Sequence, residues 1–311
     1  MRLIKFQNVD FMRWRRQAII LSTAVNLIAL LSFVVQGLDF GLDFTGGTVV
    51  EVGYQEPADL GKVRAALTRG GFDAGAVQYF GTSRDVMIRL PPVENQTSAE
   101  LSQSVFRALS QEASGKIELR RVEFVGPQVG RELAEDGGLA VLYALIGILV
   151  YVWLRFEWRF SVGAIIATVH DTIVTVAVFS LFRIEFDLTV LAAVLAVIGY
   201  SLNDTIVIFD RIRENFRKVR KGSVLDVVNR SINETMSRTI ITSGTTLMVV
   251  AALFLFGGPV IHGFSLALIV GIVTGTYSSI YVATAAAVML GVTRADLAPV
   301  KKEGEGLGSL P

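Results

Sequence analysis

Three ionisable side chains stand inside long apolar stretches of this chain. Asp204 lies in the run 195–209, and His170 and Asp171 lie in the run 161–182. An ionisable group in membrane hydrocarbon costs about 3 kcal/mol on insertion scales, so such residues usually face a bundle interior and mark an ion or proton path. The chemistry that these residue types offer is reversible proton binding.

Asp204 is the most informative of the three residues. Tyr200 and Ser201 precede it by four and three residues, so they share its face on a helix. Burial favours the neutral acid, and a nearby cation favours the carboxylate. Two interpretations stay open on these grounds. Asp204 either carries protons or stays protonated and joins two helices by a hydrogen bond.

Arg238 begins another apolar stretch, and Thr242 follows it on the same helical face. By residue type alone, an Arg at a helix end reaches toward lipid headgroups. His170 and Asp171 point about 100° apart on a helix, so both need polar surroundings. They form either a secondary proton relay or a structural pair. His262 is interpreted as an interfacial residue.

Six stretches have the length of about 20 residues that a bilayer core requires. They are 17–36, 137–154, 161–182, 188–209, 239–257 and 262–290. Together they hold two Asp and no Lys, Arg or Glu. The sequence therefore predicts a polytopic α-helical membrane protein with six transmembrane helices.

The distribution of Lys and Arg predicts the orientation of these helices. Basic residues gather in 1–16, between the second and third stretches, and in the amphipathic segment 210–238. These segments belong on the cytoplasmic side, which places both termini inside (N-in, C-in) and 37–136 outside. No small-x-small cleavage site follows the first stretch, so we expect it to be an uncleaved anchor.

The segment 37–136 has the pattern of a separate α+β domain. Strand and helix periodicities follow one another in the order β-α-β-β-α-β, which is the ferredoxin-like unit. A short helix at 128–135 is expected to lead back to the second stretch. The remaining divisions are a transmembrane bundle at 137–290 and a disordered cytoplasmic tail at 291–311.

Two further patterns concern packing. The apolar face of segment 210–238 favours a helix lying on the inner membrane surface, with a docking site for a cytoplasmic partner as the alternative. Small residues recur every four positions in the sixth stretch and allow close helix packing: Ala267, Gly271, Gly275 and Ser279.

Composition excludes several classes of protein. The 52% hydrophobic share excludes a disordered chain, and the absence of cysteine excludes disulfide scaffolds and thiolate chemistry. The net charge of +1 gives no general attraction to nucleic acid. The sequence holds no phosphate-binding loop, zinc-protease helix or nucleophile elbow. We therefore expect no enzyme activity, no cofactor and no metal site.

Four motifs resemble the SecF family of the SecDF complex, a branch of the RND superfamily that acts in bacterial protein export. They are Gly41-Leu-Asp-Phe-Thr-Gly-Gly-Thr48, Val125-Gly-Pro-Gln-Val-Gly-Arg-Glu-Leu133, the segment 197–215 and the segment 237–246. The resemblance extends over residues 9–290. It implies one half of a twelve-helix assembly, with SecD as the other half.

The resemblance also implies a function. A SecF-like subunit works with SecD and the SecYEG channel, and often with YajC and YidC, in the bacterial inner membrane. It uses the proton-motive force to promote preprotein movement and release on the periplasmic side. The alternatives are a half-size RND exporter of small molecules or lipids, and a scaffold that moves no protons.

The resemblance finally assigns residue roles. Asp204 corresponds to the transport carboxylate and Arg238 to the arginine that controls its proton. We expect polar support around Asp204 from Tyr200, Ser201, Asn203 and Thr242. The two motifs that flank the outer segment predict joints between it and the bundle, at Asp43, Gly46, Gly47, Gly126 and Pro127.

Overall fold

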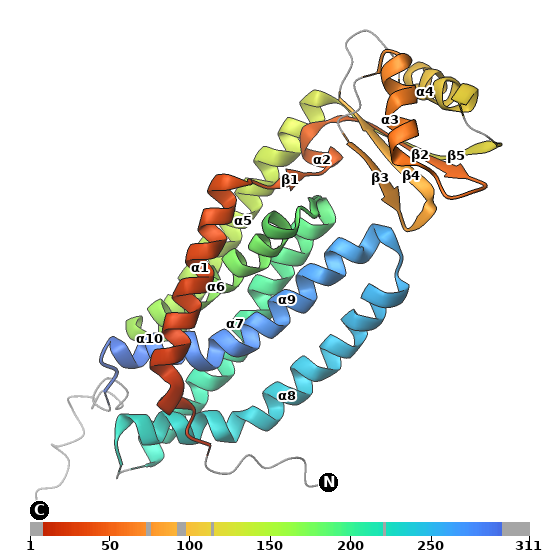
Figure 1. Ribbon diagram of the computed structural model, residues 1–311. Coiled ribbons are helices and arrows are strands. Elements are labelled where there is room, and N and C mark those ends of the chain that lie inside the picture. Colours follow the sequence, from red (N-terminus) through yellow and green to blue (C-terminus); the bar gives the residue numbers. More distant parts are fainter. Residues whose placement is uncertain (1–8, 73–75, 92–97, 113–114, 220–221, 294–311) are drawn as a thin grey trace, which may run out of the picture.

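A computed structural model describes residues 9–72, 76–91, 98–112, 115–219 and 222–293. It contains a bundle of long helices, with an α+β domain at one end of it (Figure 1). We call that end of the bundle the domain end and the opposite end the far end. The expected tail at 291–311 lies almost entirely outside the described residues.

The described residues contain six helical segments that are long and apolar enough to cross a membrane. In chain order, the bundle elements are η1 (Phe11–Trp14), α1 (Arg15–Val35), α5 (Pro127–Arg155), α6 (Trp158–Phe182), α7 (Leu188–Lys218), α8 (Val224–Phe256), η2 (Pro259–Ile261), α9 (His262–Ser278), η3 (Ser279–Ala283) and α10 (Thr284–Met289). The chain is thus a polytopic helical membrane protein.

Several helices extend beyond the predicted apolar stretches. The separate helix expected at 128–135 is the first part of a continuous α5, which Pro127 begins. The segment 210–238 is not one helix on the membrane surface. Its two halves are the end of α7 and the start of α8, and Ser223 caps the latter in a capping box with Asp226.

The apolar side chains of segment 210–238 are buried in the protein. Ile212, Val228 and Ile232 belong to the core at the far end of the bundle, so they are not available to a membrane surface. Amphipathicity alone does not distinguish a membrane from a neighbouring helix as the apolar surface. Here the two halves of the segment fold back on one another and bury that face.

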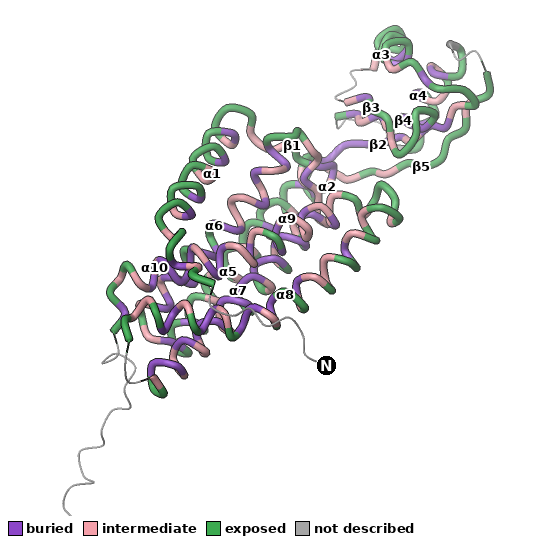
Figure 2. Tube along the Cα trace, turned by 60° about the horizontal axis from the view of Figure 1, so that its bottom comes forward, coloured by how far each residue is buried: buried purple, intermediate pink, exposed green. Residues whose placement is uncertain are grey.

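Helix α7 packs closely on α9. A Cβ added at Gly271 would overlap the side chain of Val197, and one added at Gly275 would lie 2.9 Å from Ser201 Cβ. Of the small residues predicted to allow close packing, Gly271 and Gly275 therefore do so against α7. Figure 2 shows the resulting buried surfaces in the middle of the bundle and the exposed outer face of α1.

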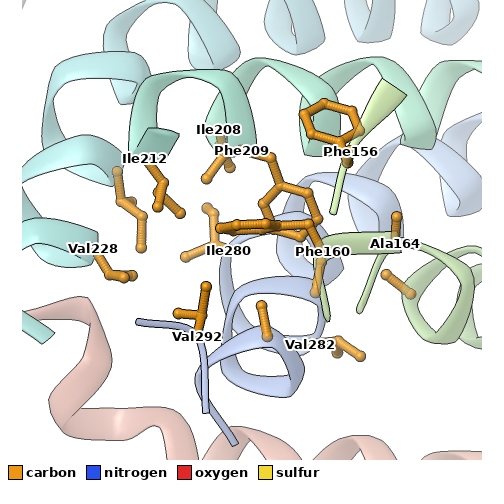
Figure 3. Packing of buried hydrophobic residues seen from close by; sticks show 14 of the residues in the cluster. Phe156, Phe160, Ala164, Ile208, Phe209, Ile212, Val228, Ile280, Val282 and Val292 are labelled. Atoms are coloured by element: carbon orange, nitrogen blue, oxygen red, sulfur yellow. The ribbon is translucent and has the colours of Figure 1, made fainter. Parts of the chain in front are cut away.

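Two apolar clusters fill the bundle core. The far-end cluster is built around Phe160 and Phe209, whose rings lie 4.8 Å apart (Figure 3). The domain-end cluster includes Phe179, Val190 and Ile198. Between them along α6, α7, α8 and α9 lie polar residues that we call the polar layer: Asp171, Ser201, Asp204, Ser243, Thr276 and Ser278.

The α+β domain is a four-stranded antiparallel sheet in the order β3-β4-β2-β5. Its elements are β2 (Gly47–Tyr54), α3 (Leu60–Arg69), β3 (Ala76–Phe80), β4 (Thr82–Leu90), α4 (Ser98–Glu112) and β5 (Ile117–Val125). The side chain of Asp59 caps α3 through the Gly61 amide at 2.8 Å. Both helices cover one face of the sheet, where Val50, Ile88 and Leu67 form the core (Figure 1).

Short elements connect the two parts. Strand β1 (Asp39–Phe40) follows α1, and β6 (Glu185–Phe186) precedes α7; the two pair in parallel. Between β1 and β2 lies the single-turn helix α2 (Leu42–Thr45), which packs against α5. The domain is therefore anchored at the head of α7, the N-terminal end of that helix.

Candidate functional site

Asp204 lies in the middle of α7 and is 3% exposed. Its Oδ2 accepts a hydrogen bond of 3.4 Å from Ser243 Oγ on α8, and Ser243 is 2.9 Å from Thr276 Oγ1 on α9. One chain of polar contacts thus links three helices. Within the described part of the chain, Asp204 has no ion pair.

Arg238 lies on α8, next to α7, but its side chain is exposed. Among the described contacts, no hydrogen bond or ion pair joins its side chain to Asp204. Thr242 lies one turn further along and donates to the Arg238 carbonyl at 3.1 Å. The pairing of Arg238 with Asp204 therefore stays a prediction, since the Arg238 side chain is exposed in the described structure.

The predicted polar support does not surround Asp204. Ser201 donates to Asp171, Tyr200 contacts Thr246 at 3.5 Å, and Asn203 is exposed. Helical spacing placed Ser201 on the face of Asp204, but the side chain turns to the neighbouring α6. Ser243 provides the contact instead. The sequence feature that could have identified Ser243 is its position in the motif 237–246, five residues after Arg238.

Asp171 forms a second buried cluster. Its carboxylate accepts hydrogen bonds from Ser201 on α7, from Ser278 Oγ on α9 at 2.6 Å, and from His170 Nδ1 at 2.9 Å when that nitrogen is protonated. Asp171 is 1% exposed. It therefore ties α6, α7 and α9 together one turn of α7 away from Asp204.

The His170 ring extends this cluster toward α1. It lies 6.3 Å from the Tyr277 ring, and the Tyr277 hydroxyl donates to the Ala18 carbonyl at 2.9 Å. The π-helical segment η3 follows Ser278 directly. Such segments occur frequently at functional sites. The adjacent residues His170 and Asp171 of α6 thus bond to one another, and Asp171 bonds to α7 and α9.

The predicted joint residues come together at the domain end. Gly47 has a φ of +123°, and a Cβ there would overlap the Leu90 carbonyl oxygen. A Cβ on Gly46 would lie 3.0 Å from Pro127 Cα. These close backbone contacts require glycine and make the joint compact. At Gly126, by contrast, an added Cβ would meet open space.

Asp43 connects this joint to the transmembrane bundle. Its Oδ2 accepts a hydrogen bond of 3.0 Å from the Leu188 amide, the first residue of α7. The side chain of Asp187 caps the same helix through the Val190 amide at 2.8 Å. The head of the helix that carries Asp204 is thus held by a residue of the joint. Among the described residues, no group of three or more His, Cys, Asp or Glu side chains could hold a metal ion.

Comparison with known proteins places this architecture in a family. Residues 105–293 match the family described as protein export membrane protein SecD/SecF, C-terminal, and residues 31–58 match the SecD/SecF GG motif. The chain is 52% identical to the protein translocase subunit SecF of Vibrio alginolyticus, over 98% of both chains. It belongs to the SecF family. As a SecF chain, it is a subunit of the Sec protein translocation machinery.

Further relatives agree with this assignment. SecF of Escherichia coli O157:H7 is 48% identical over 96% of this SecF chain and 92% of its own length, and SecF of Pseudomonas aeruginosa is 52% identical over 95% and 96%. The crystal structure of SecDF from Thermus thermophilus, a translocon-associated membrane protein, matches with a TM-score of 0.83 at 36% identity.

The solved SecDF chains are longer than this SecF chain. The match covers 93% of this chain but 40% of the Thermus chain, and a second SecDF structure, in a super-membrane-facing form, gives a TM-score of 0.69 over 39% of that chain. This SecF chain thus spans about two fifths of the length of the solved SecDF chains. The SecDF structures support SecD as the partner of this chain.

Proposed function

We propose that this SecF chain, together with SecD, uses the proton-motive force to promote preprotein movement and release on the periplasmic side. The observation that carries the proposal is Asp204, a buried carboxyl in a polar layer between two apolar clusters. An ionised Asp204 accepts a bond from Ser243, whereas a protonated one can donate. Proton binding therefore changes the contact between α7 and α8.

The size of the gradient is adequate for such a change. One charge crossing 100 mV is worth about 2.3 kcal/mol, which shifts a two-state equilibrium about fifty-fold. The cycle needs no covalent chemistry from this chain, so the subunit acts without enzyme activity.

The topology follows the positive-inside rule. Both termini lie in the cytoplasm of a bacterial cell, the bundle spans the inner membrane, and the ferredoxin-like α+β domain lies in the periplasm. The β-α-β-β-α-β order and the sheet order β3-β4-β2-β5 support the ferredoxin-like assignment.

Exposed polar groups within the spans support an assembly larger than this chain. Asn203 on α7 and Arg238 on α8 are exposed in the described structure. Contact of either polar side chain with lipid hydrocarbon would be energetically costly. SecD is the partner that covers them, and the SecYEG channel, YajC, YidC and the translocating preprotein complete the assembly.

Proton uptake by proteoliposomes that contain SecD and this chain tests the proposal. With an imposed gradient and a trapped pH dye, we expect Asp204→Asn to abolish the protein-dependent uptake. Asp210→Asn is the matched control, because Asp210 lies on the same helix but pairs with Arg155 outside the polar layer. Equal uptake by wild type and Asp204→Asn would leave a scaffold that moves no protons.

A further inference from the structure

The uncovered face of the sheet and the domain end of the bundle enclose a cleft of about 910 Å³. On one side it is lined by Val49, Glu51, Met87 and Arg89 of the sheet, and on the other by Glu185 and Pro259. The turn between β3 and β4 touches the bundle at its edge, because a Cβ on Gly81 would lie 3.1 Å from Pro259 Cγ.

Arg89 crosses this cleft from strand β4. Its Nη1 donates to the Phe40 carbonyl at 3.0 Å, and its Nη2 forms an ion pair with Glu185. Phe40 lies on β1 and Glu185 on β6, so one guanidinium joins both strands of the two-stranded sheet. The side chain is 16% exposed, and its buried Nε lacks a partner in the described structure.

Glu185 lies in a region rich in negative charge. Burial raises the pKa of this carboxyl, and Asp187 of the α7 cap, Asp39 of β1 and Asp43 of α2 raise it further; Arg89 opposes them. Arg183, although next to β6, donates to the Gln36 carbonyl at 2.7 Å. His262 lines the same cleft. Arg89 is the cation that counters Glu185 in this described network.

The position of Glu185 along the chain gives the ion pair a mechanical consequence. Strand β6 leads through Asp187 directly into α7, and Asp204 follows Leu188 by sixteen residues. At 1.5 Å per residue, the polar layer lies about 24 Å below the head of this helix. A rigid helix transmits an axial shift or a tilt over that length to whatever holds its end.

We propose that Arg89 is a positioning residue that fastens the α+β domain to the head of α7, so that the sheet follows the movement of the helix that carries Asp204. The joint at Gly46 and Gly47 holds the domain on α2 and α5, and Arg89 holds it on β1 and β6. Loss of Arg89 leaves the domain attached at the joint and able to swing away from α7.

The side-chain chemistry separates this role from simple surface pairing. Removing Arg89 leaves a largely buried carboxylate without its cation, which is a costly state. Lysine carries the charge but lacks the planar fork that serves a carbonyl and a carboxylate together, so Arg89→Lys should restore only part of the fastening.

The test is a distance measurement on the complex with SecD. The chain has no cysteine, so spin labels can be attached at Ser104→Cys on α4 and Phe182→Cys on α6, both exposed positions. We expect a narrow distance distribution in the otherwise native complex and a broader, longer one in Arg89→Gln. Arg121→Gln is the matched control, because Arg121 lines the same cleft but pairs with Glu123 on its own strand.

Thermal unfolding of the same complexes provides the second readout. Arg89→Gln/Glu185→Gln should melt at a higher temperature than Arg89→Gln alone, because no buried carboxylate is then left unpaired. An unchanged distribution in Arg89→Gln, or equal broadening in Arg121→Gln, would overturn the proposal. This inference rests on the proposed function, because that function is the reason why the domain would have to follow α7. Neither readout depends on export or proton uptake, so the role of Arg89 and the proposed function can fail separately.

Discussion

Asp204 on α7 and Asp171 on α6 are both buried, and their bonding distinguishes them. Asp171 has three hydrogen-bonding neighbours, namely His170, Ser201 and Ser278. Asp204 has one long contact with Ser243. A carboxylate offers about four acceptor positions, so Asp204 retains more capacity for new contacts than Asp171 does. We infer that Asp204 is the carboxyl whose contacts change during the cycle, and that Asp171 and His170 hold the helices in place.

Burial of the Glu185 carboxyl predicts how the stability of the protein depends on pH. Burial raises the pKa of Glu185 above its ordinary value, so the folded protein binds a proton there more readily than the unfolded chain. The cost of the buried charge is therefore present at neutral pH and disappears as the pH falls through the raised pKa. As the pH falls from neutral toward the ordinary pKa of a glutamate, we expect the melting temperature of wild type to rise relative to that of Glu185→Gln. Parallel melting curves across this range would contradict the prediction.

The sequence predicted least well which side chains contact one another across different elements. The helical spacing of Ser201 and Asp204 is correct, but a helix has several neighbours, and spacing does not say which of them a side chain meets. Arg89 alternates with apolar core residues along its strand and therefore has the pattern of an ordinary surface arginine. Its role depends on the placement of a whole domain over the bundle, which no local pattern contains.

At the scale of elements, α7 is the central component. It is bound at its head by Asp43 and Asp187, packs on α9 through Gly271 and Gly275, and carries Asp204 between the two apolar clusters. The apolar stretch 188–209 predicted this helix from Leu188 to Phe209. It missed the extension to Lys218, because the charged residues there lie on the outer face of a segment that is otherwise buried.

The joint gives a prediction that separates two glycines of the flanking motifs. Gly47→Ala should destabilise the α+β domain by about 2 kcal/mol or more, because its positive φ and the Leu90 carbonyl both exclude a Cβ. Gly126→Ala should be close to neutral, since its φ is −64° and nothing lies within 4 Å of the added atom. Chemical denaturation followed by a domain-specific probe measures both. Equal effects of the two substitutions would show that the joint is not close-packed at Gly47.

At the scale of the whole molecule, this chain spans about two fifths of the length of the solved SecDF chains that it matches. The bundle has a polar layer between two apolar clusters, and α7 leads from this layer to the domain end. The α+β domain and its connecting elements contact the N-terminal end of α7 through Asp43 and Arg89. The six spans and the family could be predicted from composition and motifs, whereas the role of Asp204 as the key carboxyl stays a prediction. The route from Asp204 to the domain became visible only in three dimensions.

Export of a slowly translocating preprotein, with and without a proton gradient, tests the central claim most directly. Wild type, Asp204→Asn and the control Asp210→Asn are compared in inverted membrane vesicles that contain SecD and SecYEG. We expect Asp204→Asn to lose only the gradient-dependent part of export, while Asp210→Asn retains it. If Asp204→Asn is stimulated by the gradient as much as wild type, this chain is not the proton-coupled subunit and Asp204 serves only as a structural hydrogen bond.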